Sequence, residues 1–391
     1  MDASLYGQLI SFHPYILQDR RVSRHNGRPA CLYECPSYCP HRLVYPVYSE
    51  VMNMPSKADW QAALAICAAI IGAGFASGRE IVSFFSGFGA ASWLGIAAAS
   101  AGIGAIIYII MKLSETAKPD SFPDLYGRLM GIPCRDAIHL LHGLLCLFTS
   151  ASMLAAGSEL GALAFPHQHA RFIGYALTLS LAVAAVCMGL QTLSAMGAVL
   201  IPATSIYFLI IALKGAYSPP LLIDGILPSV PMGLIYASFN GALAGGTICE
   251  SARKNASAKR TACLTALLFF ALLGIANLAM LRVGDIIRQM TLPAVAAASA
   301  LGAAGYYMSI AVIWLAVVTT LCAMLRSLRT QLLSLRTGQI PSLFLCAALP
   351  SLMAVLGFQI LVDAVYPLIG WICSFALIAL FFFLPDHHED S

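Results

Sequence analysis

Apolar segments about twenty residues long recur from Trp60 almost to the C-terminus, and they limit what this chain can fold into. A helix needs about 20 mainly apolar residues to cross a bilayer, where only helices and closed barrels satisfy all their backbone groups. Charged residues make up 10% of the chain, whereas soluble domains are about one quarter charged. An all-α integral membrane protein is therefore predicted.

Counting the apolar runs predicts ten membrane-spanning helices. The fourth and fifth are separated only by "MGLQTLSAMG". The expected spans cover residues 60–85, 90–111, 136–163, 172–190, 194–216, 228–250, 261–281, 293–325, 341–358 and 362–384.

The distribution of Lys and Arg predicts that both termini are cytoplasmic, because cytoplasmic loops collect positive charge. With the N-terminus inside, the inner loops hold eleven of these residues and the outer loops and helix ends hold four. The net charge of +4 follows from this bias and does not suggest a nucleic-acid partner. The inner set is Lys112, Lys118, Arg128, Arg135, Arg253, Lys254, Lys259, Arg260, Arg326, Arg329 and Arg336, and the outer set is Arg171, Lys214, Arg282 and Arg288.

Residues 1–57 form a polar extension rich in Tyr, Pro and Arg, which we expect either to be disordered or to precede a true translation start at Met52 or Met54. Its stretch "CLYECPSYCPH" contains three thiols and an imidazole, a known zinc ligand set. Its prolines would break a helix that aligned the thiols, and the spacing fits no usual paired pattern, so we predict no metal here. The ligands in question are Cys31, Cys35, Cys39 and His41.

The first span contains "IIGAGFASGREIVSFF", in which Gly72, Gly74 and Gly78 weaken a helix that must cross a membrane. A dinucleotide-binding loop is excluded because Ser77 stands where the third glycine would be, and no strand precedes it. Two interpretations remain. The glycines permit close helix packing, or they interrupt the helix so that free backbone groups bind a solute and an ion.

A second glycine-rich segment favours the interrupted helix. Span six reads "PMGLIYASFNGALAGGTICE", with Asn240-Gly241 at mid-span and Gly245-Gly246 a turn later. Interrupted segments at corresponding positions of two halves are typical of transporter binding sites. We therefore expect two five-helix repeats of inverted topology, over residues 58–217 and 225–385, followed by a cytoplasmic tail over 386–391.

The motif "IGAGFASGREIVSFF", the Asn-Gly pair of span six and "VVTT" in span eight resemble the YkvI-like amino-acid permeases. These belong to the amino acid, polyamine and organocation superfamily, which shares the LeuT fold. The resemblance covers residues 58–385. It implies ten spans in a five-plus-five inverted repeat, broken helices one and six, and alternating access.

By position, this resemblance implies that the N–H groups of Ala73 and Gly74 receive a substrate carboxylate, because a helix N-terminus favours an anion. Asn240 offers a donor and an acceptor to an amino or carboxyl group, or caps the broken helix. The substrate-binding residues expected are Gly72, Ala73, Gly74, Phe75, Phe239, Asn240 and Gly241.

The resemblance also implies a Na⁺ site formed by span one and span eight. Neutral hydroxyls cost less to bury in a membrane than a charge, although threonines in a helix also bond their own backbone. Proton-driven relatives carry a lysine in the inner half of span five, and "LSAMGAVLIPA" has none, so Na⁺ is favoured. The Na⁺ ligands expected are Ala68, Ile71, Ala316, Thr319 and Thr320.

Four ionisable residues complete the predicted site, one of them as an alternative partner. Arg79 and Asp363 match an outer gate pair of the fold, with adjacent Glu80 as the alternative partner of the arginine. Such a pair can open at modest cost while hydrated. Glu159 lies near the outer end of span three. Because ionisable residues inside membranes are functional candidates, it is a possible proton site. The alternative is an ordinary carboxylate at the membrane interface.

These features predict a secondary active transporter of amino acids or related small zwitterions in the cell membrane, coupled to Na⁺ and needing no other cofactor. The alternatives are proton-coupled transport or exchange of another small organic solute, and a transporter-fold sensor without flux. An intramembrane enzyme needs a dense polar constellation and a channel needs charged rings or repeated pore motifs, and the spans contain neither. The oligomeric state and the side chain of the substrate do not follow from the sequence.

Overall fold

The computed structural model describes residues 54–188, 190–214, 226–254, 256–283, 288–334 and 338–383. Every regular element in these ranges is helical. Residues 1–53 of the extension, with the cysteine cluster, and the tail after residue 383 lie outside the described residues, whereas Ser56 and Lys57 already belong to the start of the first helix. The cluster of Cys31, Cys35, Cys39 and His41 and the question of the translation start therefore stay predictions.

The first expected span is built from three short helices, α2 (Lys57–Ile70), α3 (Ala73–Ala76) and α4 (Arg79–Phe84). Ser56 caps α2 in a capping box with Asp59. Ile71 and Gly72 are both extended, so the helix is interrupted where the glycine pattern predicts it. Gly78 has φ +77°, a left-handed conformation that favours glycine, and it separates α3 from α4.

Five helices among the described residues are long and apolar enough to cross a membrane. They correspond to expected spans two, three, seven, eight and ten, and the protein is therefore a multi-pass membrane protein. These helices are α5 (Ser92–Ala117), α7 (Ile132–Ala164), α12 (Ala258–Leu281), α15 (Gly302–Ser334) and α18 (Tyr366–Phe381). The 3₁₀ helix η1 (Ser86–Ala91) precedes α5, and α17 (Phe358–Ile360) and the π-helical turn η3 (Leu361–Val365) precede α18.

Shorter or interrupted helices cover the other expected spans, so the count of ten and the inverted repeat stay predictions. The elements concerned are α8 (Ala170–Met188), α9 (Leu190–Lys214), α10 (Ile226–Leu243), α11 (Gly245–Arg253) and α16 (Gln339–Met353), which ends in the 3₁₀ turn η2 (Ala354–Leu356).

Two expected boundaries are wrong. Helix α10 continues through Asn240 and Gly241, and the interruption of span six comes at Ala244. Span eight does not begin at residue 293, because α14 (Pro293–Ser299) is a separate helix and α15 starts at Gly302. Gly302, at the start of α15, has φ +84°, and this left-handed backbone prevents α14 and α15 from forming one continuous helix.

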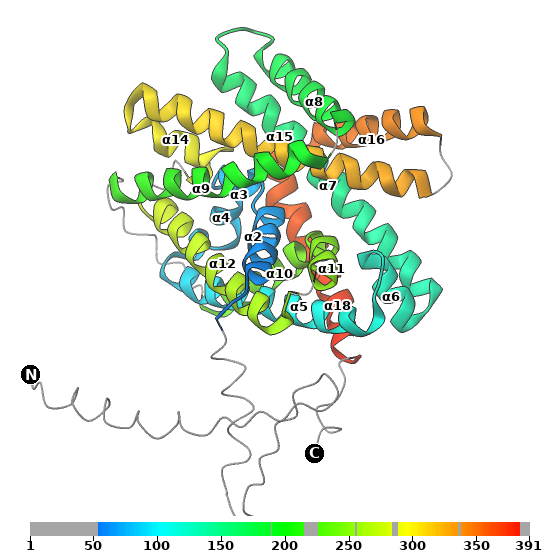
Figure 1. The fold of residues 1–391 in the computed structure, drawn as a ribbon. Helices are drawn as coiled ribbons and strands as arrows, with labels where there is room; N and C mark the ends of the chain where they lie inside the picture. Colours follow the sequence, from blue (N-terminus) through cyan, green and yellow to red (C-terminus); the bar gives the residue numbers. More distant parts are fainter. Residues whose placement is uncertain are drawn as a thin grey trace, which may run out of the picture. The chain divides into compact units, whose positions relative to one another are not determined.

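The interrupted helices lie against the longest helices of the core (Figure 1). Helix α10 packs along α5 and α18, α7 packs along α8 and α15, and α2 contacts α10, α11 and α12. Glycines permit the closest of these approaches: a Cβ on Gly161 in α7 would lie 2.6 Å from the Cα of Gly174 in α8. Small residues at such contacts are typical of membrane helix packing.

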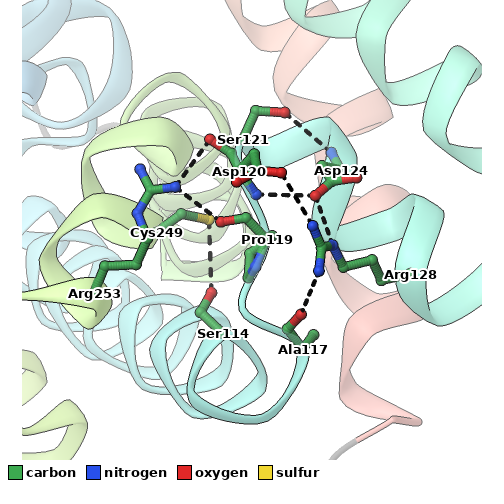
Figure 2. Close-up of polar contacts among 9 residues, drawn as sticks. All are labelled: Ser114, Ala117, Pro119, Asp120, Ser121, Asp124, Arg128, Cys249 and Arg253. Atoms are coloured by element: carbon green, nitrogen blue, oxygen red, sulfur yellow. Dashed lines mark hydrogen bonds and ion pairs between the residues drawn. The ribbon is translucent and has the colours of Figure 1, made fainter.

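A polar cluster at the predicted cytoplasmic end joins α5, α11 and the amphipathic helix α6 (Phe122–Met130) (Figure 2). Asp124 accepts hydrogen bonds from Asp120 N (2.9 Å) and Arg128 Nε (2.7 Å). Arg253, at the end of α11, donates to the carbonyls of Pro119 and Asp120. The second half of span six is thus held to the loop between α5 and α6.

Candidate functional site

The interruption between α2 and α3 leaves backbone groups without helical partners. The last hydrogen bond of α2 runs from Ile71 N to Cys67 O (2.9 Å). The carbonyls of Ala68 and Ile71 therefore accept no hydrogen bond from a helical N–H among the described residues. Helix α3 has only four residues, so the N–H groups of Ala73 and Gly74 gain little from a helix dipole. An anion at these two groups depends on the free donors alone.

Thr320 of α15 lies directly beside this interruption. A Cβ on Gly72 would be 3.1 Å from Oγ1 of Thr320, and α3 packs against α15. Thr319 differs, because its hydroxyl donates to Leu315 O of its own helix at 2.5 Å. Ala316 is fully buried on the same helix. Of the expected Na⁺ ligands, Thr320 is thus the side chain that the structure brings to the break.

Glu80 lies against the short helix α3 that follows the interruption. It is 5% exposed, and its Oε2 accepts a hydrogen bond from the hydroxyl of Tyr236 at 3.0 Å. Its Oε1 lies against Gly74, where a Cβ would come within 1.9 Å of it. The alternative pairing of Glu80 with Arg79 is therefore wrong, and Gly74 is the residue whose missing side chain makes room for this carboxylate.

Arg79 instead binds Asp363 in η3. Its Nε donates to Oδ1 at 2.9 Å, and its Nη2 contacts Oδ2. Its Nη1 also donates to the carbonyls of Arg288 and Met290. This bidentate geometry is the strong form of an arginine–carboxylate pair, and it joins the first span, the tenth span and the segment before α14.

The expected substrate residues of span six face in different directions. Asn240 donates from Nδ2 to Tyr236 O at 2.9 Å, one turn earlier on the same helix. Phe239 stacks on Tyr366 of α18 with a centroid separation of 4.5 Å. Gly241 faces α5, since a Cβ there would be 2.8 Å from Ile106. Gly241 therefore permits close packing of α10 on α5, and its place in the wall of the break stays a prediction.

Phe75 is buried in α3 and packs edge-to-face on Phe208 of α9, with centroids 5.8 Å apart. It therefore anchors the short helix α3 to α9.

Glu159 lies apart from the interruption, near the predicted outer end of α7. Its carboxylate is 30% exposed and pairs with Arg171 at 3.3 Å. It also lines a cavity of about 390 Å³ between α7, α14 and the start of α15, together with Gln289, Thr291, Ser299 and Tyr306. This exposed ion pair fits an interfacial carboxylate better than an enclosed proton site.

Solved structures share this arrangement of helices. MhsT in complex with L-phenylalanine matches with a TM-score of 0.59 at 12% identity, over 82% of this chain and 88% of that chain. Mhp1 in its inward-facing conformation matches with a TM-score of 0.56 at 16% identity, over 84% of this chain and 77% of that chain. Both are LeuT-fold transporters. This chain has the LeuT fold. No protein-family model and no curated protein sequence matches it.

Within this LeuT fold, the sequence prediction misses one group of polar residues, of which it named only Glu80, as an alternative partner of Arg79. The group comprises Glu80 with its partner Tyr236, and the hydroxyls of Tyr366, Thr149 and Ser152, which are buried without a hydrogen-bond partner among the described residues. An ionisable residue within a membrane segment is a signal that sequence alone provides for Glu80. The hydroxyl groups come from helices far apart in the chain and have no comparable signal.

Proposed function

We propose that the protein is a secondary active transporter of amino acids or related small zwitterions, working by alternating access and coupled to Na⁺. The observation that carries this proposal is the interruption at Ile71–Gly72, with unpaired carbonyls on one side and the Thr320 hydroxyl beside it, in a chain with the LeuT fold. Irregular backbone at membrane depth is tolerated where it lines a cavity or is buried in protein, and in transporters it binds solutes and ions.

Oxygen ligands suit a hard cation such as Na⁺, and this site offers carbonyls from Ala68 and Ile71 with the hydroxyl of Thr320. A solute carboxylate would bind the N–H groups of Ala73 and Gly74. The MhsT structure contains L-phenylalanine, so aromatic amino acids are the first solutes to test here.

The test is uptake of a pool of labelled amino acids into proteoliposomes containing the full chain, first with a Na⁺ gradient and then with a proton gradient alone. Accumulation with Na⁺ that is lost or strongly weakened in Thr320→Val supports the proposed site. Thr330→Val is the matched control, because its hydroxyl bonds the Arg326 carbonyl of the same helix in an exposed region. Saturable binding without uptake would favour a sensor instead. Equal uptake by Thr320→Val and wild type at limiting Na⁺ would exclude this Na⁺ site.

A further inference from the structure

The Glu80 carboxylate, on the α4 part of the interrupted first span, lies against Gly74 of α3 and Tyr236 of α10. It is 5% exposed. One oxygen, Oε2, accepts from Tyr236, while Oε1 has no hydrogen-bond partner among the described residues and lies against Gly74. A carboxylate that accepts a single hydrogen bond in an apolar interior is far from satisfied as an anion.

No cation compensates this carboxylate in the part of the chain that the structure describes. Its neighbour Arg79 faces the other way and binds Asp363. The ionisable groups that face Glu80 from the helices packed around it are two phenols, Tyr236 of α10 and Tyr366 of α18. Burying an unpaired charge costs several kcal/mol, so such a group takes up a proton unless a cation replaces it.

Hydroxyl groups extend from Glu80 into the helix bundle. The buried Tyr366 hydroxyl lies close enough to those of Thr149 and Ser152 in α7 to interact with them, but among the described residues the three form no hydrogen bond of normal geometry. Native proteins rarely leave buried polar groups unpaired without a role or a bound ligand. Each hydroxyl can both donate and accept, so the group suits a small ligand such as water or a proton.

The Glu80 side chain packs closely against Gly74. The ideal Cβ position of Gly74 is within 2.8 Å of three side-chain atoms of Glu80. Glu159, the other carboxylate considered for a proton, is 30% exposed and already paired with Arg171. We propose that Glu80, hydrogen-bonded by Tyr236 beside the interrupted helix, binds and releases a proton during the transport cycle. This inference deepens the proposed transport function. The coupling of the proton to solute transport rests on that function, whereas the binding of a proton by Glu80 does not.

The chemical step is a simple proton exchange. In uptake, a proton from water forms an O–H bond at Oε1, the oxygen without a partner, and neutralises the carboxylate, while Tyr236 continues to donate to Oε2. In release, that O–H bond breaks and the proton returns to water on the side to which the site is open.

The first experiment detects the proton without any transported solute. Infrared difference spectra of the full chain in lipid nanodiscs, recorded between acidic and alkaline pH, report buried carboxylic acids by their C=O stretch. We expect such a band in wild type, its loss in Glu80→Gln and its retention in Glu159→Gln. In Tyr236→Phe the band should shift, because the hydrogen bond to Oε2 is absent, whereas Tyr307→Phe, at an exposed position, should leave it in place.

The second experiment measures coupling by solute accumulation in proteoliposomes under a proton gradient, and solute exchange without any gradient. Glu80→Gln should lose the response to the proton gradient and keep exchange. A band that persists in Glu80→Gln, or a folded variant that keeps the wild-type response to protons, overturns the inference. If wild type transports no solute, the proposed function fails, while the infrared bands still decide whether Glu80 holds the proton. If Glu80→Gln does not fold, the shift of the infrared band in Tyr236→Phe still tests whether Glu80 holds the proton.

Discussion

The guanidinium of Arg79 and the carboxylate of Asp363, 284 positions apart in the chain, face each other through two parallel contacts. The Arg79 side chain is 8% exposed and that of Asp363 is 31% exposed, so the pair is only partly hydrated. Arg79 also donates to the Arg288 and Met290 carbonyls. One side chain thus fixes the end of the first span, the start of the tenth and the segment leading to α14.

Removing one partner of this pair should favour a conformation in which the two spans separate. Arg79→Gln and Asp363→Asn each leave the other group partly buried and unpaired, which costs about 1–3 kcal/mol. We expect a fall in transport of roughly 5- to 140-fold, since about 1.4 kcal/mol corresponds to a factor of ten. Arg79→Lys should not restore it, because an ammonium lacks the planar fork that binds a carboxylate at two points.

The control for the gate pair is Glu115→Gln, which removes an exposed ion pair with Lys112 on the surface of α5. Such pairs contribute about 0–1 kcal/mol, so transport should change little. Wild-type activity in both Arg79→Gln and Asp363→Asn would exclude a gating role. A double-mutant cycle over the two residues would then measure how much the contact contributes to stability alone.

The sequence predicts the interruption at Ile71–Gly72 because glycine destabilises a helix wherever it stands. It does not predict that α10 runs through Asn240 and Gly241 to Ala244. There the Asn240 side chain bonds the Tyr236 carbonyl, and Gly241 lets α5 approach, so tertiary packing overrides local propensity. Packing of this kind involves residues far apart in the chain, and no local pattern encodes it.

Arg79 and Glu80 are a second case, within one motif, in which the sequence does not predict which residues a side chain contacts. Both are charged and adjacent, and the resemblance to permeases points to an arginine with an acidic partner in span ten. Successive residues of a helix point about 100° apart, so their partners depend on the exact phase of α4. That phase is set by Gly78, whose φ of +77° turns the chain before Arg79.

Gly74→Ala should displace the Glu80 carboxylate. The new Cβ would lie 1.9 Å from Oε1 and 2.5 Å from Cδ of Glu80, so the side chain must move and its hydrogen bond with Tyr236 must lengthen or break. Overpacking of this kind costs about 1–3 kcal/mol. We expect weaker solute binding, measured by ligand-induced thermal stabilisation, and a shifted response to pH.

Gly246→Ala is the matched control for Gly74→Ala, because it makes the same chemical change at the other interrupted span and no atom lies within 4 Å of the added Cβ. It should leave binding and stability at the wild-type level. Equal effects of the two alanine variants would show that helix propensity, and not the fit of Glu80 against Gly74, controls the site.

Asp59→Asn should loosen α2 from α12. The Asp59 side chain is fully buried and accepts from Ser56 N, Ser257 N (2.7 Å) and Arg260 Nε (2.9 Å), which joins the start of α2 to the start of α12. Loss of the charge removes charge-assisted hydrogen bonds worth about 1.5–3 kcal/mol each. We expect faster modification of Cys67, buried in α2, by a thiol reagent, followed by peptide mass spectrometry.

The control for Asp59→Asn is Asp120→Asn, which changes a carboxylate that is 87% exposed. Its Cys67 labelling rate should match wild type. Unchanged labelling in Asp59→Asn would mean that this cluster is not what holds α2 closed, and that the packing of Ile66 and Ile70 in the core is sufficient.

The Asp124 cluster predicts a loss of stability in acid. The backbone N–H of Asp120, and then Arg128, hold the pKa of the Asp124 carboxyl below its ordinary value of 3.8. A carboxylate whose pKa is lowered by folding stabilises the folded state above the unfolded-state pKa, and this contribution disappears as the pH falls through the folded-state value. Thermal unfolding of wild type in detergent should therefore shift to lower temperature below about pH 4.

Asp124→Asn should be less stable than wild type at pH 7 and show a smaller shift in acid. Asp136→Asn, at a 64% exposed carboxylate beside Arg135, should keep the wild-type profile. A wild-type shift that Asp124→Asn reproduces in full would place the acid sensitivity in other groups.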